Sequence, residues 1–413
     1  LIGDDVLYRG YEDGEPVQYR ERTKPVMYLV PDAQKRPSKY KTLDGRKAYP
    51  KQFDGAREAR DFLRQYENAA GLEVHGYERF LYQHVAQKFP SEIDYDMTKM
   101  KIYTIDIEVE CENGFPDVEA SAEEMLCITI KDFNTKKIIT WGTREYQSKH
   151  EYRVFWTEAE MLEDFVGWWV QNTPDIITGW NCNLYDIPYI CRRVERILGE
   201  KWKKSLSPWK RVYDREIIIQ GRKNIAYDLT GVNILDYLDL YKKFTYTNQE
   251  SYRLDHIAMV ELDDKKLDHS QYENFKDFYT NDWDRFVEYN IHDVNLVDQL
   301  EDKMKLIELC IAMAYDAKVN FEDVYSQVRV WDTLIYNDLS KINVVVPPKT
   351  KTQKNDKYAG AYVKEPVPGI YDWVVSFDLN SLYPHLIMQY NISPETLVER
   401  RHATATVEGL LSQ

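Results

Sequence analysis

One apolar stretch, residues 99–110, limits most strongly what this chain can fold into. Its sequence, KMKIYTIDIEVE, is rich in β-branched and aromatic residues and therefore predicts a buried strand. Asp106 and Glu108 stand two residues apart in it, so both side chains leave the same face of the strand. Two carboxylates on an apolar strand repel each other and lose hydration unless a cation compensates them. A solvated outer face of the strand is the alternative that this pair alone leaves open.

Strand and helix patterns alternate along the next residues. Residues 127–133 and 138–143 predict further strands of the same sheet. Thr157 with Glu160 predicts a capping box before an amphipathic helix, and a strand at 175–181 follows. This alternation indicates an α/β domain with a mixed sheet.

The other elements follow from the same periodicities. They are a strand at 26–31, a helix at 56–67, a helix from near Pro188 to Gly199, a β-hairpin that turns at 220–224, a long helix from Trp283 to about Ala314, and a Pro- and Lys-rich linker at 346–357.

The composition narrows the class of protein. With 43% hydrophobic and 30% charged residues, the chain of 413 residues fits a soluble globular protein of two to four domains. The net charge of −15 argues against a protein that coats nucleic acid without specificity, although local basic patches decide contact. The five scattered cysteines include no CxxC pair, so they indicate neither a zinc site nor a disulfide framework and favour a reducing cytoplasm. No signal peptide and no membrane-spanning apolar run is found, so no membrane partner is expected. Because the chain begins with Leu rather than Met, we expect residues before Leu1 in the natural protein.

Two further segments supply candidate ligands. Asp186 precedes an expected helix start, and Asn181 follows a strand, where α/β sheets place ligand groups. Asp is also a favoured N-cap, so capping is the alternative explanation of Asp186. Tyr289 and Asp293 are four residues apart on the long helix and share an apolar face. A hydrogen-bonded core Asp beside a core Tyr is the alternative for that pair.

Together these groups match what the hydrolysis of a phosphodiester requires. The reaction needs an activated water and stabilisation of the departing oxygen, and two divalent ions about 4 Å apart supply both. Magnesium takes oxygen ligands, so several carboxylates must meet at one point. The combination predicts a nuclease more specifically than any of its parts does.

The motifs also stand in a familiar order. A DxE pair on a first strand, then Asn and Asp at a strand–helix junction, then YxxxD on a late helix resembles the signature of proofreading 3′→5′ exonucleases with a ribonuclease-H-like fold. From residue 1 into the 390s the chain resembles the replicative family B DNA polymerases of T-even-type bacteriophages. The resemblance rests on DIEVECENGFPD, ITGWNCNLYDIPY, LDYLDLYKKFTYTNQESYRLD, EYNIHDV, VWDTLIYN, YAGAYVKEPVPG and SFDLNSLYPHLI followed by NISPET.

The resemblance implies a multidomain protein of α/β and α+β parts. These would be a smaller N-terminal domain at 1–98, a ribonuclease-H-like exonuclease domain with a mixed sheet at 99–315, a connector returning to the N-terminal domain at 316–357, and the incomplete start of a polymerase palm at 358–413.

The resemblance also implies an exonuclease site with two Mg²⁺ ions, for which Mn²⁺ would substitute. Its catalytic residues would be Asp106, Glu108, Asp186, Tyr289 and Asp293. The four acids would ligate the metals, and the tyrosine would hold the attacking water. Phe115 would stack on the frayed primer end, Asn181 would place the terminal nucleotides, and the hairpin at 220–224 would help separate primer from template.

The segment WVVSFD predicts a strand that ends at Asp378, and NSLYPHLIMQ predicts a helix after it. In the family this is the first palm motif, so Asp378 would ligate both metals of a polymerase site. The incoming deoxynucleotide would meet Asp378, Leu379, Ser381, Leu382 and Tyr383, the last of which would exclude the ribose 2′-hydroxyl. Tyr358 and Gly360, in the YAGA segment, would contact template DNA. His385 stands where the family usually has Ser.

No Kx₃NSxYG segment and no YxDTD segment follows, and one palm carboxylate does not hold two metals. We therefore expect this chain alone not to polymerise DNA, and to be either a truncated portion of a longer polymerase or one subunit of a split polymerase. The implied partners are single-stranded 3′ ends, primer–template DNA, deoxynucleotides, a C-terminal polymerase portion in cis or as a second subunit, a sliding clamp and other replisome proteins. The implied location is the cytoplasm of the infected bacterial host.

Two other functions compete with this hypothesis. A noncatalytic DNA- or RNA-binding module or assembly subunit is favoured by the missing palm and by basic patches in the N-terminal region. Clustered carboxylates near phosphate would bring a pure binder no gain, however. A dedicated exoribonuclease would share the acid set, and the SLYP and NISPET segments disfavour it.

Overall fold

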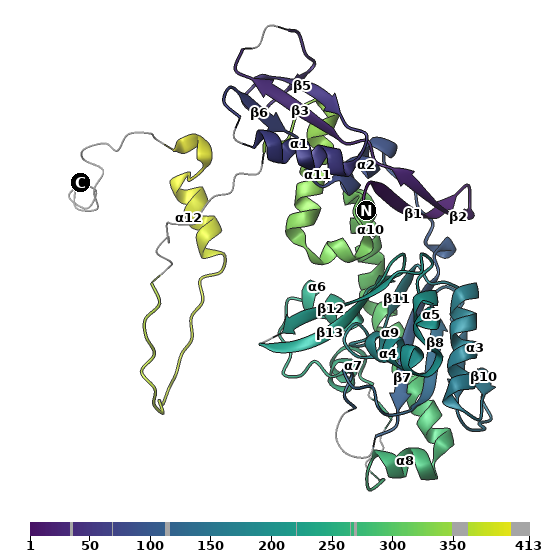
Figure 1. Cartoon of the computed structure of the whole chain (residues 1–413). Coiled ribbons are helices and arrows are strands. Elements are labelled where there is room, and N and C mark those ends of the chain that lie inside the picture. The colour runs from purple at the N-terminus through teal and green to yellow at the C-terminus, as the bar shows by residue number, and fades with distance from the viewer. Residues whose placement is uncertain are drawn as a thin grey trace. The chain divides into compact units, whose positions relative to one another are not determined.

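The computed structural model describes residues 1–33, 36–67, 69–111, 116–219, 221–264, 266–267, 271–348 and 362–397. The chain separates into two compact units, Leu1–Thr350 and Lys351–Gln413. In Figure 1 the first unit runs in colour from purple to green, and the described part of the second is yellow. Among the described residues, no helix is both long enough and apolar enough to cross a membrane.

The first unit begins with two small sheets. Their elements are β1 (Asp5–Glu12), β2 (Glu15–Arg22), β3 (Val26–Pro31), β4 (Tyr40–Lys41), β5 (Lys47–Gln52), α1 (Ala56–Tyr66), β6 (Leu72–His75), α2 (Phe80–Lys88) and the 3₁₀ turn η1 (Met97–Lys99). β1 and β2 form a hairpin, and the other sheet has the order β4-β5-β3-β6. The strand and the helix predicted for this region are confirmed as β3 and α1.

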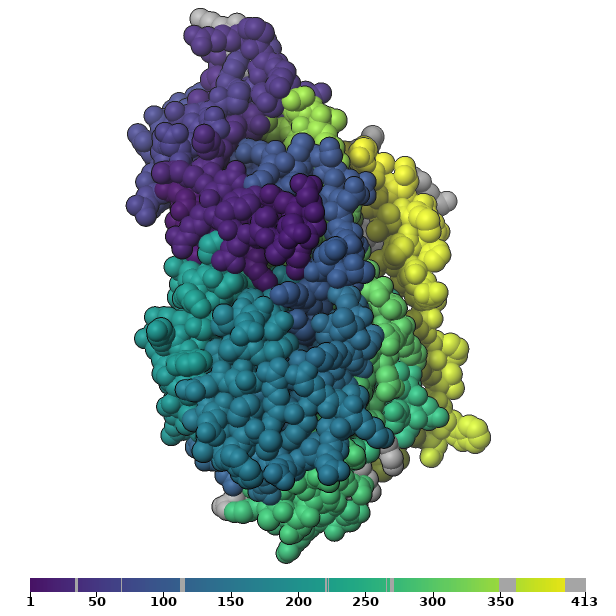
Figure 2. Space-filling model, turned by 90° about the vertical axis from the view of Figure 1, so that its right-hand side faces the viewer, coloured from purple at the N-terminus to yellow at the C-terminus, as the bar shows by residue number. Residues whose placement is uncertain are grey.

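Arg9 ties the β1–β2 hairpin to the part of the unit that follows. Its guanidinium donates to the backbone carbonyls of Thr173 (2.8 Å), Pro174 (2.7 Å) and Gly231 (2.7 Å), and it pairs with Asp175 at 3.0 Å. Figure 2 shows the hairpin, in dark purple, directly against the blue and teal surface. The hairpin thus satisfies backbone groups that flank strands of the next sheet.

A six-stranded mixed sheet with the order β10-β9-β8-β7-β11-β14 forms the centre of the first unit. Its strands are β7 (Ile102–Val109), β8 (Met125–Asp132), β9 (Ile138–Gly142), β10 (Glu151–Val154), β11 (Ile176–Thr178) and β14 (Asn233–Ile234). β7, β8 and β9 pair antiparallel, and the other three pair parallel with their neighbours. The four strands predicted for this region are confirmed, and so is the mixed sheet.

Helices cover both faces of this sheet. α3 (Glu158–Gln171) and α4 (Asp186–Leu198) pack on the face of β7 that carries Ile105 and Ile107. The opposite face, which carries Ile102 on β7 and Cys127 on β8, packs against α9 (Trp283–Met304). Asp106 and Glu108 alternate with Ile105 and Ile107, so the pleat turns both carboxylates toward α9.

Two of the predicted helix ends are confirmed. Thr157 accepts a hydrogen bond from the backbone nitrogen of Glu160 at 3.3 Å, at the start of α3. Gly199 follows α4 with φ of 97°, a conformation that favours glycine.

The prediction of one long helix up to Ala314 is wrong. The chain turns at Lys305, whose φ is 58°, and separates α9 from α10 (Leu306–Ala317). The buried Glu301 carboxylate accepts hydrogen bonds from the backbone nitrogens of Ile307 at 3.0 Å and Glu308 at 3.3 Å. A side chain of α9 therefore caps α10, which stabilises the break.

The predicted hairpin is confirmed, with a shorter turn. β12 (Val212–Ile219) pairs with β13 (Arg222–Leu229), and Ile219 lies opposite Arg222. The strands therefore pair up to Ile219 and Arg222, which leaves less room for the turn than the predicted 220–224, and Gln220 lies outside the described residues. The remaining elements of this unit are α5 (Glu200–Ser205), α6 (Tyr237–Phe244), α7 (Leu254–Leu262), α8 (Phe275–Asn281), the 3₁₀ turn η2 (Phe321–Tyr325) and α11 (Gln327–Lys341).

The second unit contains α12 (Leu382–Tyr390) and the 3₁₀ turn η3 (Pro394–Thr396) within its described residues. The helix predicted from NSLYPHLIMQ is confirmed. The strand predicted at 373–378 is wrong, because none of the described residues pairs with it and its side chains are exposed. An apolar sequence becomes a strand only where a neighbour satisfies its backbone groups. Most of the predicted linker lies outside the described residues.

Candidate metal centre

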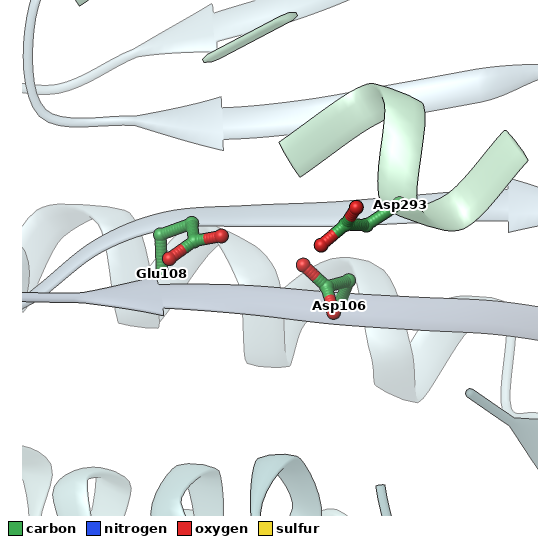
Figure 3. A group of neighbouring side chains, drawn as sticks. All are labelled: Asp106, Glu108 and Asp293. Atoms are coloured by element: carbon green, nitrogen blue, oxygen red, sulfur yellow. The ribbon is translucent and has the colours of Figure 1, made fainter. Parts of the chain in front are cut away.

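Three carboxylates meet where α9 crosses β7. Asp106 and Glu108 extend from β7, and Asp293 extends from α9 toward them (Figure 3). Each offers a carboxylate oxygen, and the three oxygens lie within 4.8 Å of one another. Two of the three segments predicted from the sequence are thereby brought to one point.

Asn290 orients one of these carboxylates. Its side-chain nitrogen donates to Asp106 Oδ2 at 2.6 Å, and Cys127 Sγ on β8 donates to Asn290 Oδ1 at 3.4 Å. Sequence reasoning missed Asn290, although it lies three residues before Asp293 and therefore on the same helix face. The amide fixes one oxygen of Asp106 and leaves the other to face the cluster.

Asp186 lies beside β7 but outside this group of three. It is the first residue of α4, and its Oδ1 accepts a hydrogen bond from the backbone nitrogen of Ile107 at 3.0 Å. The alternative that Asp186 is a helix cap is wrong, because Tyr185 occupies the cap position and the Asp186 carboxylate binds β7 instead. The segment reaches β7 because residue 179 is glycine: a Cβ there would lie 2.5 Å from the carbonyl oxygen of Ile105.

Asn181 lies in the loop between β11 and α4, in the left-handed conformation with φ of 67°. Asn tolerates this conformation better than most residues. The loop is held by Asp236, whose carboxylate accepts hydrogen bonds from the backbone nitrogens of Asn181 (3.0 Å), Asn183 (2.9 Å) and Leu238 (3.0 Å). Asp236 is a second residue that sequence reasoning missed. It caps α6, and in doing so it fixes the loop beside the carboxylates.

Lys266 is the third residue missed, and it contacts two of the predicted site residues. Its ammonium donates to Asp293 Oδ2 and to the Tyr289 hydroxyl, the latter at 3.1 Å. Tyr289 is thus placed at the cluster, one helical turn before Asp293. In the sequence, Lys265 and Lys266 follow two aspartates, and this pattern alone indicates no role for either lysine.

The carboxylates carry more negative charge than the protein compensates. Asp106 and Glu108 keep some exposed surface, yet dense protein surrounds them, and burial raises the pKa of Asp106 well above its ordinary value. Burial also raises the pKa of Glu108 to about 8 and that of Asp186 to about 7. Neighbouring carboxylates add to the shifts of Asp106 and Glu108, and Lys266 opposes them.

These properties fit a divalent cation. The donor set consists of carboxylate oxygens, which suit hard cations such as Mg²⁺ and Mn²⁺. Among the described residues, the buried Asp293 Oδ1 has no hydrogen-bond partner, so this oxygen is available to a cation. The remaining exposed surface of Asp106 and Glu108 gives a cation access.

The other predicted site residues belong to other parts of the chain. Phe115, Tyr358 and Gly360 lie outside the described residues. The palm residues Asp378, Leu379, Ser381, Leu382 and Tyr383 belong to the second unit, where all five are exposed around the start of α12. His385 Nδ1 lies 2.9 Å from the backbone oxygen of Ser381, at the first turn of that helix.

The fold and the cluster define a class: a ribonuclease-H-like nuclease domain with a carboxylate metal centre. Comparison with known families agrees. The profile described as "DNA polymerase family B, exonuclease domain" matches residues 79–257, and the profile "DNA polymerase family B" matches residues 320–410. The chain belongs to DNA polymerase family B. The exonuclease domain of this family uses divalent metal ions.

Individual relatives come from phages and viruses. The DNA-directed DNA polymerase of Escherichia phage RB69 is 35% identical over 96% of this chain, and that of Enterobacteria phage T4 is 34% identical over 96%. The DNA polymerase catalytic subunit of Human herpesvirus 7 (strain JI) is 30% identical over 73% of this chain and is covered over 31% of its own length. The chain spans about half, 46%, of the length of each of the two phage polymerases.

Proposed function

We propose that this chain carries the proofreading 3′→5′ exonuclease of a replicative family B DNA polymerase, which removes nucleotides from DNA 3′ ends. The observation that supports this most is the cluster of Asp106, Glu108 and Asp293 with its free Asp293 Oδ1. Burying several carboxylates together destabilises the fold, and their negative charge repels phosphate. A protein that only binds nucleic acid would gain nothing from such a cluster.

Asp106, Glu108, Asp293 and Asp186 would hold two Mg²⁺ ions, with Mn²⁺ as a substitute. When bound, the ions would activate the attacking water and stabilise the departing 3′ oxygen. Asn290 keeps Asp106 oriented, and Asp186 reaches its place through its hydrogen bond to β7. The protein's part is thus to hold ligand oxygens at fixed positions before DNA arrives.

Tyr289 and Lys266 would act on the nucleophilic side of the reaction. The tyrosine hydroxyl accepts a hydrogen bond from the ammonium of Lys266, and as a phenol it would hold the attacking water. Burial is the main cause of the raised pKa of Tyr289, and the raised pKa keeps the phenol protonated at neutral pH. Lys266 also places a positive charge beside the point where phosphate charge would develop.

The remaining site residues would handle DNA and nucleotides. Asn181 and Phe115 would place the primer end, and the β12–β13 hairpin would help separate it from the template. Tyr358 and Gly360 would contact template DNA. In a complete polymerase, Asp378, Leu379, Ser381, Leu382 and Tyr383 would form part of the site for metal and deoxynucleotide. A sliding clamp, other replisome proteins and a polymerase portion would be its partners, in the cytoplasm of an infected bacterium.

The test is degradation of a 5′-labelled single-stranded DNA oligonucleotide in Mg²⁺. We expect a ladder that shortens from the 3′ end, disappears with Asp106→Ala and persists with Asp302→Asn, a change at an exposed position of the same helix. Full activity of Asp106→Ala would contradict the proposal. Tight binding without degradation would favour the binding module, and a preference for RNA would favour an exoribonuclease.

A further inference from the structure

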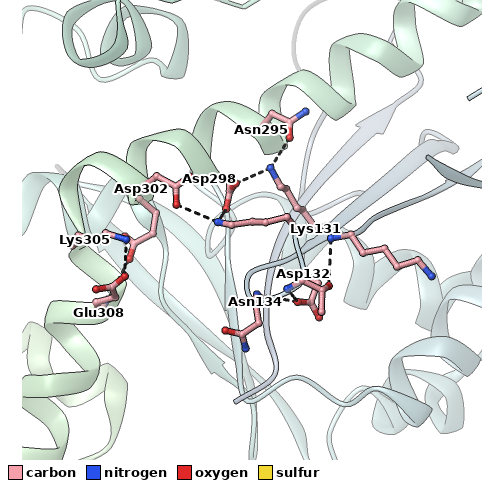
Figure 4. Close-up of polar contacts among 12 residues, drawn as sticks. Lys131, Asp132, Asn134, Asn295, Asp298, Asp302, Lys305 and Glu308 are labelled. Carbon is pink, nitrogen blue, oxygen red and sulfur yellow. Dashed lines mark hydrogen bonds and ion pairs between the residues drawn. The ribbon is translucent and has the colours of Figure 1, made fainter. Parts of the chain in front are cut away.

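A second charged cluster joins α9 to the end of β8 and the residues that follow it (Figure 4). Lys131 on β8 donates to Asn295 Oδ1 at 2.7 Å and pairs with Asp298 Oδ2 at 2.7 Å. Lys136 pairs with Asp298 Oδ1 at 2.6 Å and with Asp302 Oδ1 at 3.2 Å. The side chains of Lys131 and Asp298 are 11% and 6% exposed, so this pair is shielded from water. We call these five residues the Lys131–Asp298 network.

The network adjoins the carboxylates on both elements that carry it. On β8, Lys131 shares a face with Thr129 and Cys127. These two residues lie opposite Asp106 and Glu108 in the β7–β8 register. On α9, Asp298 follows Asp293 by five residues, about 7.5 Å along the helix axis. The network thus joins α9 to β8 two residues along the strand from Thr129, which lies opposite Asp106.

This position matters because the carboxylates repel across the same junction. Asp293 on α9 faces Asp106 and Glu108 on β7, and Lys266 is the cation that pairs with Asp293 there among the described residues. Apolar contacts of α9, such as those of Leu296, Val297 and Leu300, favour burial but are non-directional. The charged hydrogen bonds of Lys131 to Asn295 and Asp298 are directional, so they fix how far α9 is shifted and rotated against β8.

We propose that the buried part of the Lys131–Asp298 network, formed by Lys131, Asn295 and Asp298, is a positioning device that keeps Asp293 within range of Asp106 and Glu108, so that the three can bind one divalent cation. The proposal rests on the metal centre of the proposed function and adds the residues that hold its geometry. Lys131 and Asp298 are not members of the carboxylate cluster. They act through α9, and are positioning residues.

Mn²⁺ binding to the full chain, measured by electron paramagnetic resonance of free Mn²⁺, tests this without any requirement for activity. We expect Lys131→Met to weaken Mn²⁺ binding by about tenfold or more, as losses of outer contacts around metal ligands do. Lys131→Arg, which keeps the charge and the donors, should retain most of the affinity. Asp302→Asn is the matched control, since Asp302 belongs to the network but is 56% exposed and pairs with Lys136 alone in it. It should bind Mn²⁺ as the wild type does.

The sign of the effect separates geometry from charge. Removing a positive charge near a cation site strengthens cation binding by Coulomb's law. A weakening in Lys131→Met therefore requires displaced ligands. Lys131→Met that is folded, as circular dichroism would show, and binds Mn²⁺ with unchanged or higher affinity overturns the proposal, even if its melting temperature falls.

Two further variants keep the test decisive. If Lys131→Met does not fold, Lys131→Gln takes its place, because it also removes the positive charge and the ion pair with Asp298 but leaves a polar side chain, so the sign of the effect keeps its meaning. It must weaken Mn²⁺ binding by a similar factor, or the proposal falls. Asp106→Ala shows that the bound Mn²⁺ is at the cluster. Equal binding by Asp106→Ala and wild type would overturn the inference, whereas binding at the cluster without DNA degradation would contradict the proposed function alone.

Discussion

Two groups of charged side chains lie along α9, and they differ in the balance of positive and negative charge. In the Lys131–Asp298 network two lysines meet two aspartates, and Asp298 is paired through both oxygens. Among the described residues, Asp106, Glu108 and Asp293 at the metal centre meet one lysine, and Asp293 Oδ1 has no hydrogen-bond partner. A group whose positive and negative charges balance can hold its elements in a fixed geometry. A group with excess negative charge instead favours the binding of a cation. The same helix and sheet thus carry one charged group that holds them together and one that is suited to bind a cation.

The largest expected effect comes from Asp106→Ala, which removes a ligand from the unbalanced group. We expect exonuclease activity to fall by about a thousandfold or more, because the reaction depends on ions held by several carboxylates. Rates of 3′ shortening under single-turnover conditions measure this. Asp302→Asn, in the balanced group, should lose less than about twofold, which is typical of a surface position. Equal losses in both variants would remove the contrast between the two groups.

Lys266→Met should lower the rate by about a hundredfold, the usual size of a lost proton-orienting or charge-stabilising contact. The variant removes the hydrogen bond to Tyr289 and the counterion of Asp293. Lys303→Met is the control, because that lysine is 49% exposed and pairs with Glu261 away from the cluster. A full rate for Lys266→Met would show that the ammonium only compensates charge in the absence of metal.

Metal removal should make stability depend on pH. Folded Glu108 has a pKa raised to about 8 by burial, so the folded chain holds this proton more tightly than the unfolded chain does. Its contribution is therefore fully present below about pH 4.5 and is lost as the pH rises toward 8. In EDTA we expect a loss of about 2 kcal/mol in the free energy of unfolding over this range, measured by urea denaturation. Mg²⁺ should restore it at pH 8, and Glu108→Gln should flatten the slope.

The smallest expected effect concerns the approach of the Asp186 segment to β7. Gly179→Ala would place a methyl group 2.5 Å from the Ile105 carbonyl, and we expect a loss of about 1–2 kcal/mol with a displaced Asp186. Gly167→Ala in α3 meets nothing within 4 Å and should stabilise by up to about 1 kcal/mol. Thermal melts compare the two. An unchanged Gly179→Ala would mean that the loop yields easily.

The sequence predicted the central strands of the mixed sheet and the segments that carry the clustered carboxylates, because local periodicity determines them, whereas the strand predicted at 373–378 is wrong. The sequence alone did not decide whether Asp186 caps the helix or ligates a metal, since an aspartate at the start of a helix suits either role. Asn290 and Lys266 escaped prediction for another reason. Their roles depend on which side chains α9 and the 266–267 segment meet across space, and no local pattern encodes that. The break at Lys305 was missed because Glu301, within the helix itself, caps the next one.

Arg9 has a consequence for how the first unit can be divided. Its guanidinium serves three carbonyls and one carboxylate at the flanks of β11 and β14, strands that belong to the sheet of the metal centre. A protein that started at residue 99 would leave those acceptors to water and would expose the surface on which the β1–β2 hairpin rests. The nuclease sheet therefore depends on a side chain from the first ten residues. Arg9 is far from β11 and β14 along the chain but is in direct contact with the residues that precede them.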